Sequence, residues 1–448
     1  ITCIGMGAFY GCSSLMSIVI PDSVTSIGEG AFSGCSSLAS IVIPDGVSII
    51  GDWVFEDCSG LASVTIPDSV TSIGGRAFMY CSNLKSIAIP DSVASIGEYA
   101  FYGCGSLTSV TMGDGVTSIG DWAFSRCDNL TSIIIPDSVT SIGVAAFGNC
   151  DSLTSISVDP QNSVYHSDGS CLIETQSKTL IMGCGASRIP SDGSVTAIGD
   201  YAFYYCDDLT SIQIPDRVIS IGNSSFSNCS SLTSIMIPDS VTSIGDEAFS
   251  RCDGLTSITI PDSVISIGDD AFYSCSGLTS VTIGDGVTFI GESAFEWCPI
   301  QYASIPAAAI DYITQSYELQ VVIITSGTAI GERAFSNCSS LTSVTIPDSV
   351  TSIGDSAFSD CWSLMNITIP DSVTSIGNYA FYNCNSLTSI MIPDSVTSIG
   401  DRAFYYCDNI ESATMPTWAI DYIPVDNLTT VVLTGGTDIG YRAFYGCE

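Results

Sequence analysis

Cysteine is the residue with the clearest chemical potential in this chain, and it recurs at a fixed spacing. Seventeen of the 20 cysteines lie on a lattice with a period of 23 residues, at Cys12–Cys150, Cys206–Cys298, Cys338–Cys407 and Cys447. Such a row could bind metal or form disulfides, but it contains no C-x-x-C motif. In a repeat, neighbouring thiols point the same way at about 4.8 Å, which suits disulfide geometry poorly. We therefore expect buried, reduced thiols that pack as small apolar groups.

Two cysteines outside the row, Cys171 and Cys184, lie near His166, the only histidine. They could form a disulfide with each other, or join His166 around zinc, although their spacing is not that of a standard zinc site. A Ser-His-Asp arrangement is also conceivable, but no pattern orients the abundant serines and aspartates around His166. We expect no catalytic site, and Cys3 has no explanation.

Aspartate forms two further rows, one after proline at a predicted turn and one after glycine. Turn capping and solubility account for both rows. Because carboxylates about 5 Å apart repel each other, loosely bound Ca²⁺ is the alternative, although no EF-hand or related loop is present. The candidates for this loose calcium binding are Asp239, Asp262, Asp348, Asp371 and Asp394. No other cofactor is expected.

The charge balance excludes several classes of function. The chain has 47 acidic and 10 basic residues, a net charge of −37. Nucleic-acid binding needs a basic surface, which is missing here. No apolar run approaches the roughly 18 residues of a membrane span, so we expect no direct membrane insertion. Only 13% of residues are charged, and a polar surface rich in Ser and Thr favours an extracellular or cell-surface location.

The elements that position these residues follow from the repeat unit, L-T-S-[IV]-x-I-P-D-S-V-T-S-I-G-D-x-A-F-x-x-C-x-S. Its first part alternates inward apolar with outward polar residues, as a strand does. Proline ends this strand, Asp-Ser turns the chain, and Val and Ile form a second inward pair. The Ala-Phe pair, for example Ala146–Phe147, predicts a short helical turn. The structural core is predicted from Cys35, Cys58, Cys81, Cys104, Phe101 and Phe124, with Gly97 and Gly120 at bends that a side chain would forbid.

One unit cannot bury its own apolar face, so the units must stack. We predict a single solenoid over residues 1–448 with about 17 coils. Three intervals break the period. Residues 159–190 predict a β-hairpin insertion around Gln176–Lys178, and residues 299–338 and 408–447 predict variant units of 40 residues, each a shortened coil followed by a normal one. Neither end has the polar cap that a solenoid needs, which favours a longer chain or ends that stack on partners.

The outward strand positions are the predicted ligand-binding surface. A nearly constant serine column lies beside a variable, mildly apolar column, and this combination suits protein recognition. Ice binding would need a regular array of threonines, and Val, Ala, Gln and Met interrupt the threonines here. Unselected drift on that face is the alternative. The candidate ligand-binding residues are Thr65, Ser86, Ser109, Thr111, Ile134, Gln213, Met236, Thr259 and Thr282.

The motifs I-P-D-S-V-T-S-I-G-D and A-F-x-x-C-x-S-L are similar to those of the BspA-like, or Treponema pallidum-type, leucine-rich repeat family, over nearly the whole chain. The resemblance implies an α/β repeat solenoid, a right-handed superhelix with a parallel β-sheet on its concave face and short helical turns and short strands on the other side. It also implies surface adhesion and protein binding.

Two functional hypotheses follow. The first is a non-enzymatic recognition or adhesion module that binds a protein or glycan through the concave sheet and the hairpin insertion. The alternative is a structural component of a filament, sheath or large assembly, held by end-to-end self-association and by cations bridging the acidic rows.

Overall fold

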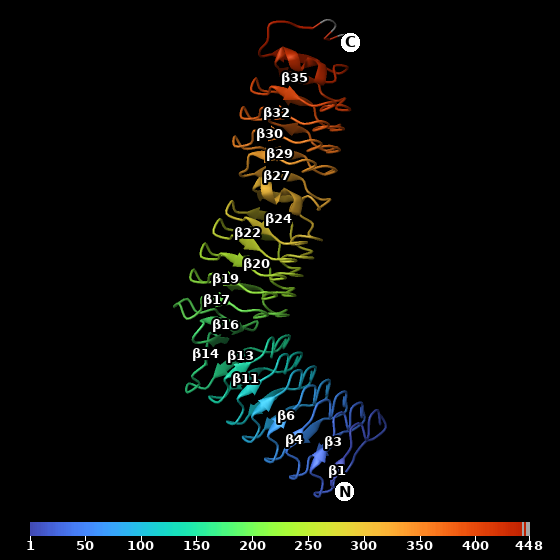
Figure 1. Cartoon of the computed structure of the whole chain (residues 1–448), viewed down its shortest axis with the longest axis vertical. Coiled ribbons are helices and arrows are strands. Elements are labelled where there is room, and N and C mark those ends of the chain that lie inside the picture. Colours follow the sequence, from blue (N-terminus) through green and yellow to red (C-terminus); the bar gives the residue numbers. More distant parts are fainter. Residues whose placement is uncertain (441–442, 445–448) are drawn as a thin grey trace. The chain divides into compact units, whose positions relative to one another are not determined.

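The structure is a computed structural model that describes residues 1–440 and 443–444. The chain forms two compact units, Ile1–Gly254 and Leu255–Glu448, each built from stacked coils (Figure 1). The architecture is a parallel-strand β-solenoid of about 18 turns. Helix in the described residues is confined to two short segments in the second unit. The predicted α/β class is therefore wrong, because the regular secondary structure is mostly β.

Each regular coil contributes one longer and one shorter strand. In the first unit the longer strands pair in parallel, and the register joins Ser40 to Ser63 and Ser86 to Ser109, the 23-residue period of the sequence. These strands are β3 (Ser40–Val42), β5 (Ser63–Thr65), β7 (Ser86–Ile89), β9 (Ser109–Met112), β11 (Ser132–Ile135), β13 (Ser155–Val158), β18 (Ser211–Gln213) and β20 (Ser234–Met236).

The shorter strands form a second parallel row in the same unit. Each is a pair of residues that ends in a buried or half-buried isoleucine. The row comprises β1 (Cys3–Ile4), β2 (Ser26–Ile27), β4 (Ile49–Ile50), β6 (Ser72–Ile73), β8 (Ser95–Ile96), β10 (Ser118–Ile119), β12 (Ser141–Ile142), β17 (Ala197–Ile198), β19 (Ser220–Ile221) and β21 (Ser243–Ile244).

The insertion in the first unit is a three-stranded antiparallel meander rather than a simple hairpin. Strands β15 (Cys171–Glu174) and β16 (Thr179–Met182) form the hairpin that the sequence suggested, and β14 (Tyr165–Asp168) adds on the other side of β15. Strand β16 pairs in parallel with β17. The meander therefore joins the row of shorter strands instead of projecting from it.

The second unit repeats the two rows. Its longer strands are β22 (Ser257–Ile260), β24 (Ser280–Ile283), β26 (Tyr302–Ile305), β27 (Val321–Ile324), β29 (Ser343–Thr345), β31 (Asn366–Ile367), β33 (Ser389–Met391), β35 (Ser412–Met415) and β36 (Thr430–Leu433). Its shorter strands are β23 (Ser266–Ile267), β25 (Phe289–Ile290), β28 (Ala329–Ile330), β30 (Ser352–Ile353), β32 (Ser375–Ile376) and β34 (Ser398–Ile399).

The two variant units each contain a shortened coil. Strands β26 and β27 pair in the register Tyr302 to Val321, and strands β35 and β36 pair in the register Ser412 to Thr430, so both coils are shorter than the regular period. A helical segment replaces the shorter strand in each. These segments are η1 (Ala307–Ala309) with α1 (Ile310–Ile313), and η2 (Thr417–Tyr422).

The segment from glycine to cysteine, where a helical turn was predicted, is instead a run of tight turns. In one coil the N–H groups of Ala31, Ser33 and Cys35 each bond the carbonyl three residues back. Alternate N–H groups leave the coil entirely, since Phe32 donates to Val54 and Gly34 to Glu56 in the next coil. The third residue of the outer turns has positive φ, as a type II turn requires, and many of these residues are not glycine, for example Trp122 at φ 56°. A helix cannot form because its donors are used between coils.

This run of bonds, which we call the turn ladder, has a direction. Where one regular coil follows another in the described residues, the donors of the ladder bond the coil that follows, and the acceptors bond the coil that precedes. One edge of each turn segment in the described residues therefore presents N–H groups to its neighbour, and the opposite edge presents carbonyls.

The core lies between the strand rows and the turn ladder. Phenylalanine rings stack face to face along it, with centroids 5.1 Å apart for Phe78 and Phe101 and 5.0 Å apart for Phe101 and Phe124. All six of the predicted core cysteines and phenylalanines are fully buried. A Cβ on Gly97 would lie 2.5 Å from the backbone nitrogen of Gly75, so the close approach of neighbouring coils requires glycine there.

Candidate recognition surface

The nine predicted surface residues lie on the longer strands of the two units. Eight of them are exposed and Thr282 is half-buried. They alternate with buried residues, as on β11, where Ile133 and Ile135 face the core and Ile134 is 65% exposed. The strand register places Gln213 beside Met236 and Thr259 beside Thr282.

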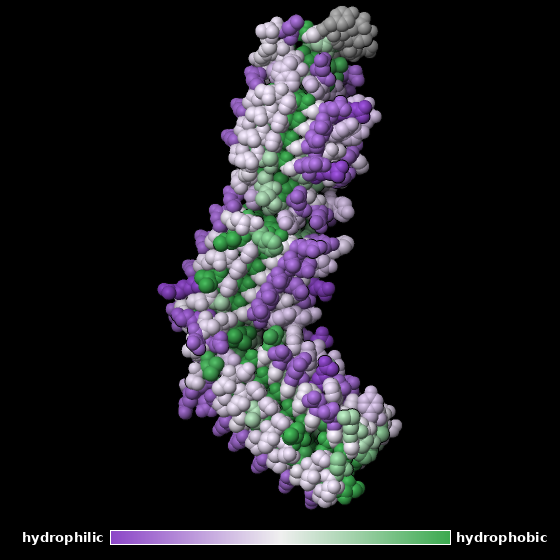
Figure 2. All heavy atoms as spheres, in the orientation of Figure 1, coloured by the Kyte–Doolittle hydropathy of each residue, from purple (hydrophilic) through white to green (hydrophobic). Residues whose placement is uncertain are grey.

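The outward columns combine polar residues with isolated apolar side chains. In Figure 2 the visible face carries pale small polar residues, purple rows of strongly polar residues and a green apolar stripe. Exposed apolar residues recur at the variable position of the column, namely Val19, Val42, Ile134, Met236 and Met391. Exposed apolar groups in a polar surround are a common composition of protein interfaces.

The aspartates that follow glycine have a local structural role. Asp52 accepts a hydrogen bond from Gly75 N, and Asp121 accepts one from Val144 N, both one coil further on. Asp200, Asp269 and Asp355 do the same. These side chains therefore cap backbone donors of the next coil, where an alanine would leave them without an acceptor.

The five calcium candidates are exposed and follow proline. Two already accept hydrogen bonds through Oδ1, Asp262 from Asp285 N at 2.9 Å and Asp394 from Thr434 Oγ1 at 2.5 Å. Within the described residues no group of three or more His, Cys, Asp or Glu side chains is arranged to hold a metal ion.

The cysteine row is bonded as well as buried. The thiol of Cys58 donates to Phe32 O at 3.1 Å and that of Cys104 to Phe78 O at 3.3 Å, and the same bond recurs along both units. Sequence reasoning predicted the burial but missed this bond. Burial raises the pKa of the Cys58 and Cys104 thiols to about 12. Since the thiolate is the reactive form, these cysteines are inert as nucleophiles.

The histidine and the two cysteines of the insertion do not form a site. His166 Nδ1 lies 2.9 Å from Thr175 Oγ1 at the surface, whereas Cys171 and Cys184 are buried free thiols. Ser187 Oγ donates to Ser170 O and accepts from Cys184 N. The polar groups near these thiols therefore bond to one another.

The described part of the chain contains no helix with the length and apolar character to cross a bilayer.

Comparison with known families shows a match to the BspA type leucine rich repeat region, at residues 2–93, 71–192, 196–318 and 315–426. These segments cover most of the sequence.

The chain belongs to the BspA-type leucine-rich repeat family. Among solved structures, a leucine-rich repeat protein from Bacteroides ovatus is 29% identical, with 97% of this chain and 88% of that chain covered and a TM-score of 0.38. The pneumococcal vaccine antigen PcpA is 20% identical, with 81% and 82% covered and a TM-score of 0.55. A leucine rich cell surface protein from Faecalibacterium prausnitzii is 26% identical, with 99% and 85% covered and a TM-score of 0.42. No curated protein matches the chain.

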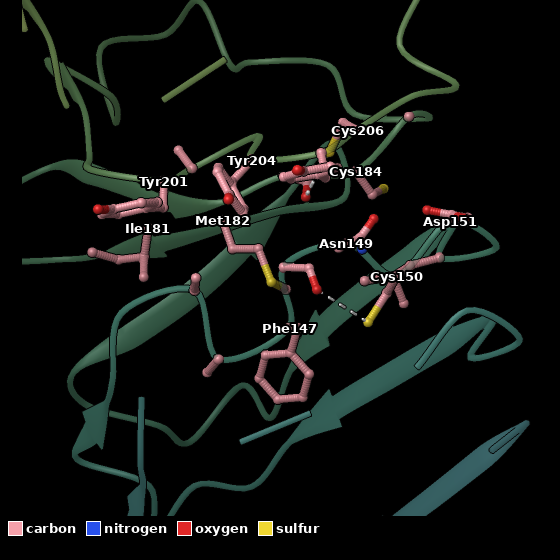
Figure 3. Close-up of a pocket in the computed structure, with 18 of the residues that line it drawn as sticks. Phe147, Asn149, Cys150, Asp151, Ile181, Met182, Cys184, Tyr201, Tyr204 and Cys206 are labelled. Atoms are coloured by element: carbon pink, nitrogen blue, oxygen red, sulfur yellow. Dashed lines mark hydrogen bonds between the residues drawn. The ribbon is translucent and has the colours of Figure 1, made fainter. Parts of the chain in front are cut away.

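The BspA-type core is interrupted where the meander enters the first unit. The phenylalanine stack stops at Phe147 and resumes with Phe203 and Phe226. Met182 fills part of this gap, between Phe147 and Tyr204 (Figure 3). A Cβ on Gly183 would lie 2.0 Å from the Phe203 ring, so only glycine lets the two coils meet. The remaining cavity of about 30 Å³ holds about one water, which is too small for a ligand.

Aromatic residues at the non-glycine turn positions are a feature of this BspA-type chain that sequence reasoning missed. Trp122 contacts the rings of Tyr201 and Tyr204 edge-on, at 5.6 and 5.4 Å. The guanidinium of Arg76 lies 5.5 Å from the Tyr99 ring. These positions recur at a fixed place between the glycine and the cysteine of each repeat, which could have indicated that they share one face. The predicted helical turn hid this relation, because it places them on different sides.

Proposed function

We propose that this chain is a non-enzymatic protein-interaction module that binds its partner through the outward columns of the longer strands and the meander. The observation that carries the proposal is the column of exposed apolar side chains at the variable strand position, above all Val42, Ile134 and Met236 in the first unit. Exposed apolar side chains on a rigid parallel sheet lose little entropy when a partner covers them.

The chemistry of the repeated cysteines and aspartates supports a binding role over an enzymatic one. The buried thiols donate to backbone carbonyls, and the aspartates after glycine cap backbone donors. The residues most able to do chemistry are therefore used for the scaffold. Membership of the BspA-type family supports protein binding as the activity, and a glycan is the alternative class of partner for the same surface.

We place the protein at the cell surface or outside the cell. The support is its composition, with 13% charged residues and exposed strand positions occupied mainly by Ser and Thr. Protease treatment of intact cells, followed by mass spectrometry, checks this placement. Cleavage of the chain without lysis supports it, and protection until lysis contradicts it.

The binding proposal is tested by a triple variant, Val42→Asn, Ile134→Asn and Met236→Asn. All three side chains are exposed, so the fold should be kept, whereas binding of a partner isolated on the wild-type chain should weaken at least about tenfold. A matched control replaces Ile219 and Ile265, which are exposed by 53% and 55% beside the shorter strands. Equal affinity of the wild type and the triple variant would contradict the proposal.

The structural alternative, a filament or sheath component, predicts a different outcome. Electron microscopy of the purified protein should then show fibres whose length changes with calcium or EDTA, because bridged carboxylates are sensitive to divalent cations. Isolated particles under both conditions count against self-assembly and favour the recognition module.

A further inference from the structure

The first variant unit interrupts the turn ladder of the second unit. In the regular coils that follow, Arg333 N donates to Asp355 O, Phe335 N to Ala357 O and Asn337 N to Ser359 O. The corresponding donors before the break are the N–H groups of Ser293, Phe295 and Trp297. These three have no hydrogen-bond acceptor among the described residues, because the shortened coil contains no turn segment.

On the other side of the break, backbone carbonyls lack hydrogen-bond donors from the described chain. The turn segment that resumes at Gly331 presents its carbonyl edge, and in regular coils that edge accepts from the coil before it. The carbonyls of Glu332, Ala334 and Ser336 accept no hydrogen bond within the described part of the chain. A row of donors therefore lies on one side of the break, and a row of acceptors lies on the other.

An open pocket of about 490 Å³ occupies this break. Phe295 and Trp297 line it from the donor side, Ser336 and Asn337 from the acceptor side, and Thr314–Glu318 between them. A ligand that carries both carbonyls and N–H groups along one chain can bond both rows at once. An extended polypeptide has this property, as in binding by strand addition.

The walls of the pocket favour a cationic side chain. Trp297 and Tyr317 are 70% and 85% exposed, and aromatic faces attract ammonium and guanidinium groups. The carboxylates of Glu296 and Glu318 bond only neutral partners, Ser293 Oγ at 2.6 Å and Gln301 Nε2 at 3.3 Å. The only ion pairs in the described residues are Glu332 with Arg333 and Asp401 with Arg402.

Trp297 has a backbone conformation that favours glycine, with φ 61°. A bulky residue in this region costs energy, and its ring gains little burial in return. The equivalent residues of other coils, such as Tyr80 and Arg126, have φ 58° and 57°, so this conformation is a property of the repeat and not of the pocket.

We propose that the pocket at residues 295–337 binds an extended peptide segment that carries lysine or arginine. The peptide carbonyls accept from the N–H groups of Phe295 and Trp297, and its cationic side chain lies between the Trp297 ring and the carboxylates of Glu296 and Glu318. This inference rests on the proposed protein-interaction role and adds a second surface with its own partner chemistry.

Among the described residues, the second variant unit also has unbonded backbone donors beside a pocket, but different residues line that pocket. The N–H groups of Arg402, Phe404 and Tyr406 likewise have no acceptor among the described residues. A pocket of about 580 Å³ lies beside them, lined by Tyr405, Tyr406 and Tyr422. Its lining carries Asp401, Asp408, Asp421 and Asp426 as well as Arg402, so it is also acidic, and the preference of a basic peptide for the first pocket rests on Trp297, the stronger cation–π partner.

Titration of the intact chain with a capped peptide of alternating lysine and threonine tests the proposal, with isothermal calorimetry as the readout. We expect saturable binding that Trp297→Ala weakens at least about tenfold. Trp362→Ala is the matched control, because Trp362 is 54% exposed in the same unit but lies outside the pocket. Unchanged affinity of Trp297→Ala, or equal binding of a glutamate–threonine peptide, would overturn the proposal.

Two further measurements isolate the backbone contacts. Replacing the peptide's amides by esters, which are poorer acceptors, should weaken binding several-fold if each lost bond contributes about 1 kcal/mol. Hydrogen exchange should be fast at residues 293, 295 and 297, slow at the bonded residues 356, 358 and 360, and slowed at the first set by the peptide. Ester and amide peptides of equal affinity would contradict the donor-row mechanism.

The outcome is separable from that of the strand-face proposal. The triple variant on Val42, Ile134 and Met236 should bind the lysine–threonine peptide with wild-type affinity, because those residues lie in the first unit. If the triple variant lost peptide binding and Trp297→Ala kept it, the peptide would be assigned to the strand face, and the proposal that the pocket binds it would be refuted.

Discussion

At the scale of single residues, the repeated cysteine and aspartate side chains complete backbone hydrogen bonds that the neighbouring coil leaves open. The Cys104 thiol donates to Phe78 O, and the Asp121 carboxylate accepts from Val144 N. Because a buried carbonyl without a partner costs about 1–3 kcal/mol, the buried Cys104 bond contributes more than the size of the side chain suggests, whereas the Asp121 bond is exposed and contributes less. The sequence predicted burial of the cysteines from their period, but it could not show the direction of a thiol.

The non-glycine residues with positive φ are a second residue-scale feature, and they lead to a stability prediction. Ser356 has φ 54° and its side chain makes no hydrogen bond in the described part of the chain. Ser356→Gly should raise the free energy of unfolding by about 0.5–1 kcal/mol, because relief of the left-handed strain exceeds the entropy that glycine adds to the unfolded chain. Urea denaturation measures the change.

The matched control is Ser356→Val at the same position. A β-branched residue is poorly tolerated at positive φ, so this variant should lower the free energy of unfolding. A glycine variant less stable than the wild type would show that the turn is not strained.

At the scale of elements, the strands could be predicted and the turns could not. Alternation of apolar and polar residues placed β11 with Ile134 outward, and the hairpin of β15 and β16 followed from its turn residues. The Ala-Phe pair suggested a helical turn. This prediction failed because helix propensity does not reveal that alternate N–H groups bond the next coil. The pocket at the first variant unit depends on that ladder, so the sequence could not predict it either.

The thiol row is an element whose stability depends on pH. Burial raises the pKa of the Cys58, Cys104 and Cys252 thiols to about 12, from an ordinary value of 9.0. The unfolded chain therefore releases these protons first, and the stabilising effect is complete below pH 9 and is lost as the pH rises toward 12. Each thiol should remove about 1.4 kcal/mol per pH unit within this window.

We therefore expect a steep loss of stability between about pH 9 and pH 12, measured by thermal denaturation with circular dichroism. Thiol alkylation at neutral pH should label the exposed Cys3 and Cys12 and spare the buried row. Stability independent of pH across this range, or rapid labelling of Cys104 in the native protein, would contradict the account.

At the scale of the whole molecule, the acidity of the chain is largely uncompensated. The net charge is −37, and both ion pairs in the described residues join sequence neighbours at 3.9 Å on the surface. Exposed pairs of this kind contribute little to stability. Repulsion between carboxylates therefore opposes folding, and screening should relieve it.

Raising NaCl from about 0.01 to 0.3 M should increase the melting temperature by several degrees, because the Debye length falls from about 30 Å to well under 10 Å. The comparison with CaCl₂ at matched ionic strength tests the calcium prediction. An additional rise that Asp239→Asn and Asp371→Asn abolish would indicate bound Ca²⁺. Equal rises with both salts would show that the proline-linked aspartates do not bind it.

The equivalence of successive coils has a consequence for how such a chain can change length. Phe101 stacks on Phe78 and on Phe124 in the same way, and Cys104 and Cys127 each reach the phenylalanine carbonyl one coil back. Excising one whole period from a regular stretch would thus reunite surfaces that already fit. Gain or loss of a whole period preserves the stacked phenylalanines and the thiol bonds of the remaining coils, so the molecule can be lengthened or shortened by whole coils.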